Sequence, residues 1–215
     1  MDETGEFAFG NGASRLYGVS FVFHEQDDNI KKEINNLNDR LKRIGYTDMI
    51  HMAELIAKRG DYANFSIKKR KSIFNAIYEF SNWIPAKYIS IFIDKKYINN
   101  NKILRQQLIN IINEFITYHI NYFNKFDKIV MYYDNGQEIL SNILIQCFSK
   151  FNNFTHISNF NHKEKILFQV ADMLTFIDKY NFKYKNKLSF TKSEKYFFND
   201  FHIKEILKRL RRKRF

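Results

Sequence analysis

Short apolar runs alternate with longer segments of helical periodicity through the second half of this chain. Residues 87–93 (KYISIFI) and 128–133 (KIVMYY) are rich in β-branched and aromatic side chains, and helical patterns follow them at 102–124 and 137–150. The run 128–133 lacks polar alternation, which is typical of a parallel-sheet strand buried on both faces. The alternation predicts an α/β fold with some parallel pairing. We expect 128–133 at the centre of one sheet that also contains 16–23 and 87–93.

The rest of the chain is predicted to be mostly helical. Further helices are expected at residues 28–44, 49–58, 67–82, 163–179 and 192–212, with a weak strand at 154–158. These patterns predict an α/β domain at residues 1–180 that carries a helical insertion at about 28–82. A helical, basic extension at 181–215 follows it.

Composition limits the class of protein. The chain has 215 residues and 45% hydrophobic residues, which is enough for one domain with a sizeable core. No apolar run approaches the roughly 20 residues that span a bilayer, and the start MDETGEF does not resemble a secretory signal. The single cysteine, Cys147, lies in an apolar helical run and is predicted to be a buried structural thiol. We therefore expect a cytoplasmic protein with no membrane partner.

The formal charge of +12 suggests a polyanionic partner such as nucleic acid. An excess of Lys, Asn, Ile, Phe and Tyr is also typical of AT-rich coding sequences, so the total charge is weaker support than its clustering. The terminus KEILKRLRRKRF concentrates cations, which either form a solvated helix end or contact phosphates. The predicted phosphate contacts are Lys208, Arg209, Arg211 and Arg212.

Acidic residues occur at four places that are otherwise apolar or close to predicted strand ends. They are Asp2 with Glu3, Asp94 in ISIFIDKK, Asp134 in VMYYDNGQ, and Asp172 in FQVADML. A carboxylate beside an apolar core is costly unless something pairs with it. A hard divalent cation, Mg²⁺ or Mn²⁺, is the common partner of carboxylates clustered at strand ends. This arrangement suggests metal-dependent chemistry on phosphodiesters.

Three of these aspartates have an alternative, structural interpretation. Asp134 begins Asp-Asn-Gly and could be a turn residue or the N-cap of the following helix. Asp94 is more simply explained as a strand-end ion pair. Asp172 could belong to a solvated helix face, although few charges accompany it in the helix, which favours a functional role.

Three other side chains are weaker candidates. His51 precedes Glu54 by three residues in IHMAEL, a spacing that suits a metal pair, an acid/base pair or a plain His–Glu contact. Lys95 follows Asp94 and could face a scissile phosphate.

The ordered set of motifs resembles domain-of-unknown-function family 3800. The resemblance rests on the opening DETG, on IHMAEL, on ISIFIDKK, on VMYYD and on FQVADML, and it covers residues 1 to about 180. The family usually has DESG after a strand, whereas here Thr4 replaces the serine and only Met1 precedes the motif.

This resemblance implies a ribonuclease-H-like fold with a mixed sheet flanked by helices. By position, Asp2 matches the first-strand aspartate, Asp134 the central one and Asp172 the helical one, which together would hold two divalent ions about 4 Å apart. Glu3 or Glu54 would supply a fourth ligand.

The leading hypothesis is therefore a metal-dependent nuclease acting on DNA or RNA. The alternatives are a catalytically inactive nucleic-acid-binding or partner-binding module of a defence or mobile-element system, and a phosphatase or other phosphoesterase. We expect Asp2, Asp134 and Asp172 to converge.

Overall fold

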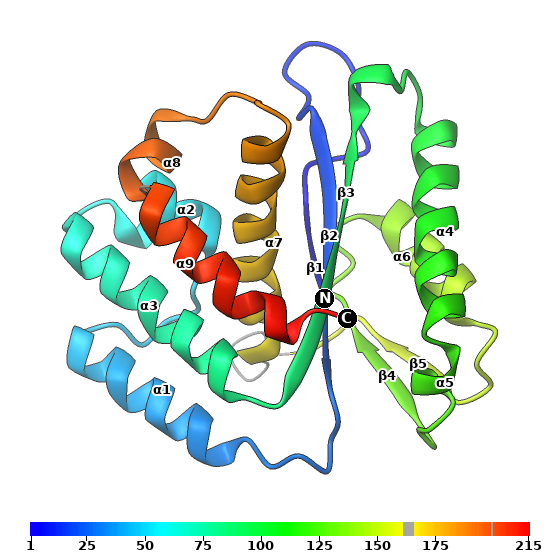
Figure 1. Ribbon diagram of the computed structural model, residues 1–215, viewed down its shortest axis with the longest axis horizontal. Coiled ribbons are helices and arrows are strands. Elements are labelled where there is room, and N and C mark those ends of the chain that lie inside the picture. The colour runs from blue at the N-terminus through cyan, green and yellow to red at the C-terminus, as the bar shows by residue number, and fades with distance from the viewer. Residues whose placement is uncertain (161–165, 199) are drawn as a thin grey trace. The chain divides into compact units, whose positions relative to one another are not determined.

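The chain folds into two compact units. The computed structural model describes residues 1–160, 166–198 and 200–215 (Figure 1). The first unit contains Met1, Glu3–Val19 and Ile91–Asn161, and the second contains Asp2, Ser20–Ser90 and His162–Phe215. The chain passes from one unit to the other within β2 (Leu16–His24), within β3 (Ala86–Asp94) and again between Asn161 and His162.

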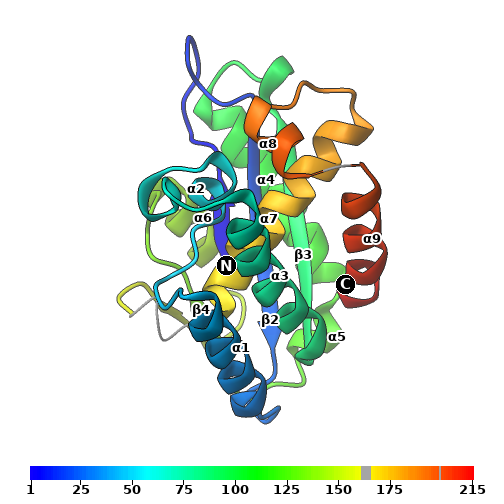
Figure 2. The ribbon, with the colours of Figure 1, turned by 90° about the vertical axis from the view of Figure 1, so that its left-hand side faces the viewer.

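The first unit places helices beside a small parallel sheet. Its elements are the 3₁₀ turn η2 (Lys95–Tyr97), α4 (Asn101–Tyr118), α5 (Ile120–Phe123), β4 (Ile129–Tyr132), α6 (Glu138–Phe148) and β5 (Phe154–Ile157). β4 pairs in parallel with β5, with Ile129 opposite Phe154. This pairing confirms that the second half contains parallel strands. Helices α4 and α6 lie side by side (Figures 1 and 2) and contribute Leu108, Ile112 and Leu144 to the core.

The second unit is largely helical. It contains α1 (Lys31–Ile44), α2 (Met52–Ala57), η1 (Gly60–Tyr62), α3 (Ile67–Trp83), α7 (Ile166–Lys185), α8 (Lys192–Phe197), α9 (Asp200–Leu210) and η3 (Arg211–Lys213). Helices α1 and α3 run next to each other (Figures 1 and 2), and the core between the helices is rich in aromatic rings. Phe74, for example, packs edge-on against Phe197 and Phe198.

The sheet arrangement differs from the prediction of one sheet with 128–133 at its centre. A three-stranded sheet has the order β1 (Asp2–Thr4), β2, β3, and β4 belongs instead to the two-stranded sheet with β5. The strand buried along most of its length is β2, whose first six residues are all buried. In β4 only Met131 is buried, so its apolar run does not mark a central strand.

The start of the chain forms a strand of its own. The family pattern places this motif after a strand, whereas here Asp2–Thr4 is itself the strand β1. The Met1 amine donates a hydrogen bond to the Tyr132 carbonyl at 3.0 Å, so within the first unit the chain start lies beside the end of β4.

The predicted helices are confirmed with altered ends. The Ser66 hydroxyl accepts a hydrogen bond from the Lys69 N–H at the start of α3, and Gly45 ends α1 with a left-handed φ of 73°. The helix expected at 102–124 is broken at His119 into α4 and α5, and the one expected at 192–212 is divided into α8 and α9. The segment expected at 163–179 forms α7 from Ile166; residues 163–165 lie outside the described residues.

The C-terminal segment belongs to the second unit. Arg214 forms an ion pair with the buried Asp178 of α7 and donates a hydrogen bond to the Tyr88 hydroxyl. The Phe215 N–H donates to the Tyr88 carbonyl. The chain end is therefore attached to β3 and α7, while a domain boundary at residue 180 remains a prediction.

Candidate functional site

Two carboxylates of the first unit lie close together beyond the end of β4. A methyl group built on Gly136 would lie 2.9 Å from Glu3 Oε1 and 3.4 Å from Asp134 Oδ1. Glycine therefore leaves room between two acidic side chains from distant parts of the sequence. Asp134 lies just beyond the carboxyl end of a parallel strand, where α/β sheets commonly place their sites. We call Glu3 and Asp134 the acidic pair.

Polar neighbours orient Glu3. The Gln137 amide donates to Glu3 Oε1 at 3.3 Å and to the Gly5 carbonyl at 2.9 Å. Burial raises the pKa of Glu3, a hydrogen bond from Tyr133 lowers it, and the negative charge of Asp134 raises it again. Burial and the Glu3 charge raise the pKa of the Tyr133 phenol, so Tyr133 remains a neutral hydrogen-bond donor.

Asp134 is partly explained as a turn residue. The Gly136 N–H donates to Asp134 Oδ1 at 3.1 Å, which is the side-chain hydrogen bond expected of an Asp-Asn-Gly turn. The alternative prediction, that Asp134 is the N-cap of the following helix, is wrong because Gln137 occupies that position in α6.

In the second unit, Asp172 and Gln169 of α7 hold the segment that begins α2. Asp172 Oδ2 accepts a hydrogen bond from the Met52 N–H at 2.8 Å, and Gln169 Oε1 accepts one from the Ile50 N–H at 3.0 Å. The two side chains are three residues apart on α7, so they share one face. The motifs IHMAEL and FQVADML therefore meet in space. His51, the N-cap residue of α2, makes no side-chain capping bond, and Asp172 satisfies the neighbouring N–H instead.

Asp172 titrates far from its ordinary range. Burial raises its pKa from 3.8 to about 6, against lowering by the Met52 hydrogen bond and by the His51 charge. The residue as a whole is half-buried. A titratable group of this kind is a candidate for acid–base chemistry.

His51 and Glu54 are both exposed at the start of α2. A methyl group built on Gly60 would lie 2.6 Å from Glu54 Oε2, which places this carboxylate over the η1 turn. Burial raises the pKa of Tyr62, and the charges of Asp172 and Glu54 raise it further. The Tyr62 hydroxyl accepts a hydrogen bond from the His51 N–H and is 2.5 Å from the Tyr46 hydroxyl. These hydrogen bonds fix the backbone at His51, next to the Met52 N–H from which Asp172 accepts a hydrogen bond.

Lys95 and Asp94 have structural partners. The Lys95 ammonium is buried and donates to the Glu6 and Ala8 carbonyls at 2.9 and 2.7 Å, so it fixes the loop after β1. Asp94 forms a two-bond ion pair with Arg15, which confirms the interpretation of an ion pair at a strand end. The Arg15 hydrogen bond holds the pKa of Asp94 below its usual range.

The acidic pair fits part of a divalent-metal site. Carboxylate oxygens are the ligands that Mg²⁺ and Mn²⁺ prefer, and a cation would offset the repulsion between Glu3 and Asp134. Within the described ranges 1–160, 166–198 and 200–215, no group of three or more His, Cys, Asp or Glu side chains is placed to hold an ion. Asp134 belongs to the first unit, and Asp2 and Asp172 belong to the second. Their convergence remains a prediction.

Some neighbours of the site were not predicted. Tyr133 and Gln137 were not identified as site residues, although Gln137 follows Asp134 by only three positions in YYDNGQ. Nothing in the sequence indicated that Gln137 would contact Glu3, because 134 positions separate them. Cys147 is buried, as predicted, and burial raises its pKa to about 11.

The basic C-terminal cluster is only partly free to contact a partner. Its exposed cations include Lys204, Lys208, Arg209, Arg211 and Arg212. Lys213, in contrast, donates to the Ile84 carbonyl at 2.6 Å, and Arg214 pairs with Asp178. The four predicted phosphate contacts are therefore all accessible.

No protein-family model, curated protein or solved structure matches this chain. Across the described part of the chain, none of the helices has both the length and the apolar character needed to cross a membrane. The class of protein that the structure itself defines is a mixed α/β protein rich in helices.

Proposed function

We propose that this protein is a divalent-metal-dependent nuclease of ribonuclease-H-like type, as the resemblance to domain-of-unknown-function family 3800 implies. The observation that carries the proposal is the acidic pair, Glu3 and Asp134, beyond the end of β4. Both residues are half-buried, and two such carboxylates near one point repel each other unless a cation or a proton offsets their charge. Such an arrangement costs stability and is typical of functional sites.

Glu3 and Asp134 would hold the ion, with Asp2 and Asp172 as the further ligands expected from the motif order. A bound Mg²⁺ or Mn²⁺ would supply Lewis acidity and lower the pKa of a water molecule. Tyr133 and Gln137 orient the Glu3 carboxylate through their hydrogen bonds. Without a metal, burial raises the pKa of Asp172 to about 6, and a bound cation would favour its charged, metal-binding form.

Exposed cations support a nucleic-acid substrate. Lys208, Arg209, Arg211 and Arg212 project from the end of α9 and from η3, where they would contact phosphates. The formal charge of +12 also favours a polyanionic substrate such as nucleic acid. The cytoplasmic location expected from the sequence is part of this proposal.

The alternative is a catalytically inactive module that binds nucleic acid or a partner. Two observations favour it: Asp172 already serves as a hydrogen-bond acceptor for α2, and no three-ligand cluster occurs among the described residues. Such a module would need only the basic surface and not the carboxylates.

A cleavage assay separates these functions. The purified protein is incubated with single- and double-stranded DNA and RNA and with a small phosphomonoester, in Mg²⁺, Mn²⁺ or EDTA. We expect metal-dependent cleavage of nucleic acid that falls to the EDTA level in Asp134→Asn and Glu3→Gln. Asp94→Asn, which removes a carboxylate paired with Arg15, is the matched control and should cleave normally. Hydrolysis of the monoester alone would indicate a phosphatase. The absence of cleavage under every condition would favour the catalytically inactive binding module.

A further inference from the structure

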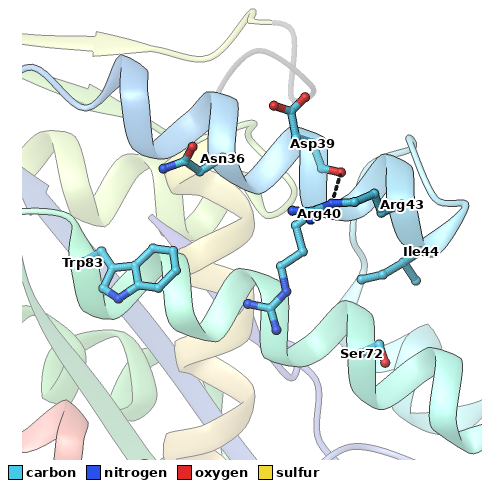
Figure 3. A pocket seen from close by; sticks show the side chains of 7 residues that line it. All are labelled: Asn36, Asp39, Arg40, Arg43, Ile44, Ser72 and Trp83. Atoms are coloured by element: carbon cyan, nitrogen blue, oxygen red, sulfur yellow. Dashed lines mark hydrogen bonds between the residues drawn. The ribbon is translucent and has the colours of Figure 1, made fainter.

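A groove lies between α1 and α3 in the second unit, on residues to which the proposed function assigns no role. It has a volume of about 630 Å³ and is lined by Asn36, Asp39, Arg40, Arg43, Ile44, Ser72 and Trp83. Ser72 and Trp83 belong to α3, and the other lining residues belong to α1 (Figure 3). Contacts fix an antiparallel arrangement of the helices: the Lys69 ammonium donates to the Gly45 carbonyl at one end, and Arg40 pairs with Glu79 further along.

The only tryptophan of the chain lies in this groove. Trp83 is the last residue of α3, and 59% of its surface is exposed. Indole is a large apolar side chain, and leaving it in water forfeits the stabilisation that burial would provide. The neighbouring Ile84 is fully buried in the core, whereas the Trp83 indole lies outside the core. An exposed aromatic face is a surface on which another flat group can stack.

Two cations, Arg40 and Arg43, line the groove, and Arg40 is paired with Glu79. The two helices that form the groove, α1 and α3, together carry nine Lys or Arg residues against three Asp or Glu, and one of the nine, Arg70, is buried outside the lining. Arg43 is exposed, with its Nε donating to the Asp39 carbonyl, and its remaining guanidinium N–H groups can meet an anion. Asp39 is the one acidic side chain of the lining.

These features fit a strand with unpaired bases better than other polyanions. A base stacks on an aromatic ring only when its face is free, which is the case in a single strand. The Asn36 amide offers both a donor and an acceptor to a base edge, and Arg43 suits phosphate. Ser72 and Trp83 are eleven positions apart on one helix, so the lining extends over about 16 Å. That length corresponds to about five stacked nucleotides at 3.4 Å each.

We propose that the α1–α3 groove binds single-stranded nucleic acid, with a base stacked on Trp83 and the backbone phosphates near Arg43. This inference deepens the proposed function, since it rests on a nucleic-acid partner and names the surface that holds the strand. It does not depend on catalysis.

The single tryptophan makes the test specific to this site. In EDTA, so that no cleavage occurs, Trp83 fluorescence is followed while a 12-nucleotide single strand of DNA or RNA is added to the full chain. We expect saturable quenching by the single strand and much weaker quenching by the duplex of the same sequence. Stronger quenching by the duplex, by polyglutamate or by anionic lipid vesicles would overturn the proposal.

Variants separate stacking from general attraction. With a labelled oligonucleotide, Trp83→Ala should raise the dissociation constant roughly five- to 150-fold, as expected when one base no longer stacks on an aromatic ring. Trp83→Phe should restore most of the affinity. Tyr196→Ala, which removes another aromatic ring of the second unit that is 67% exposed, should change it less than twofold. Arg43→Gln should reduce the log–log salt slope by about 0.7.

The outcomes also separate this inference from the proposed function. Trp83-dependent binding in EDTA without cleavage in Mg²⁺ or Mn²⁺ would support binding by the groove and contradict the nuclease activity. Metal-dependent cleavage by Trp83→Ala at the wild-type KM would contradict binding by the groove and support the nuclease activity. Equal affinities of Trp83→Ala and Tyr196→Ala, with thermal unfolding unchanged, would also overturn the inference.

Discussion

Asp172 accepts a backbone hydrogen bond from Met52 and has a pKa raised to about 6 by burial. The first property is structural, because it satisfies an N–H at the start of α2 that would otherwise lack a partner. The second disfavours the charged form. One carboxylate thus supports the fold through its oxygen lone pair and opposes it through its charge.

Replacing Asp172 with Asn should reverse part of the pH dependence of stability. A carboxyl with a raised pKa keeps its proton longer in the folded chain than in the unfolded one, so the free energy of unfolding falls as pH rises from about 4 to about 6. Asp172→Asn keeps an acceptor for the Met52 N–H and has no charge. We expect its advantage over the wild type to grow across this window, to roughly 1–3 kcal/mol.

Urea unfolding at pH 4 and pH 7 measures this difference. Asp127→Asn, at an exposed position of the first unit, is the control and should show no such trend. Identical pH profiles for Asp172→Asn and the wild type would contradict the raised pKa.

At the scale of elements, α2 depends on side chains from other helices. It has only six residues, too few to be stable alone. Gln169 and Asp172 bind its first turn, and the buried Arg70 of α3 donates to the Leu55 and Ile56 carbonyls at its end. The position of His51 and Glu54 is therefore set by α3 and α7.

Removing one of these hydrogen bonds should loosen the start of α2. Gln169→Ala leaves the Ile50 N–H buried without a partner, which should lower the free energy of unfolding by about 1–3 kcal/mol. Amide hydrogen exchange at residues 50–57 should become faster. Gln106→Ala, which removes an exposed hydrogen bond to Asn110 on α4, is the matched control. Unchanged exchange in Gln169→Ala would mean that α2 is held by other contacts.

The exposed part of the C-terminal cluster should determine the salt dependence of duplex binding. Replacing Arg209, Arg211 and Arg212 with Gln should reduce the slope of log K against log salt by about 0.9 for each phosphate that the protein no longer neutralises. A charge-matched control replaces Lys102, Lys125 and Lys128 of the first unit, all of them exposed. Equal slopes for the two variants would indicate that the cluster is an ordinary solvated helix end without phosphate contacts.

Local elements were predictable from sequence, whereas their pairing was not. Helices α1, α3 and α6 follow apolar spacing, which is a local property of the chain. The apolar run 128–133 suggested a central strand, but within β4 only Met131 is buried, and the strand pairs with β5. Hydrogen bonding between distant strands leaves no local mark in the sequence beyond the burial pattern.

The site was predicted unevenly for the same reason. Asp134 was identified because it follows an apolar run, and Asp172 because it interrupts an apolar helix. Glu3 was expected only as a fourth ligand, yet it is the carboxylate that lies beside Asp134. The partnership between Asp94 and Arg15 joins residues 79 positions apart and was not foreseen.

At the scale of the whole molecule, the central claim is that the protein cleaves nucleic acid with a divalent metal held by carboxylates, as proposed from the acidic pair Glu3 and Asp134. An inactive binding module would need only a basic surface and none of these carboxylates. Loss of cleavage when a single carboxylate is removed would therefore separate the two functions.

The most direct measurement is the rate of nucleic-acid cleavage by Asp172→Asn in Mg²⁺ and Mn²⁺, with folding verified by urea unfolding. The account predicts that cleavage falls to the EDTA level, as in Asp134→Asn, while the stability at pH 7 equals or exceeds that of the wild type. Cleavage by Asp172→Asn at the wild-type rate would contradict it, as would a wild-type protein that cuts neither DNA nor RNA with either metal.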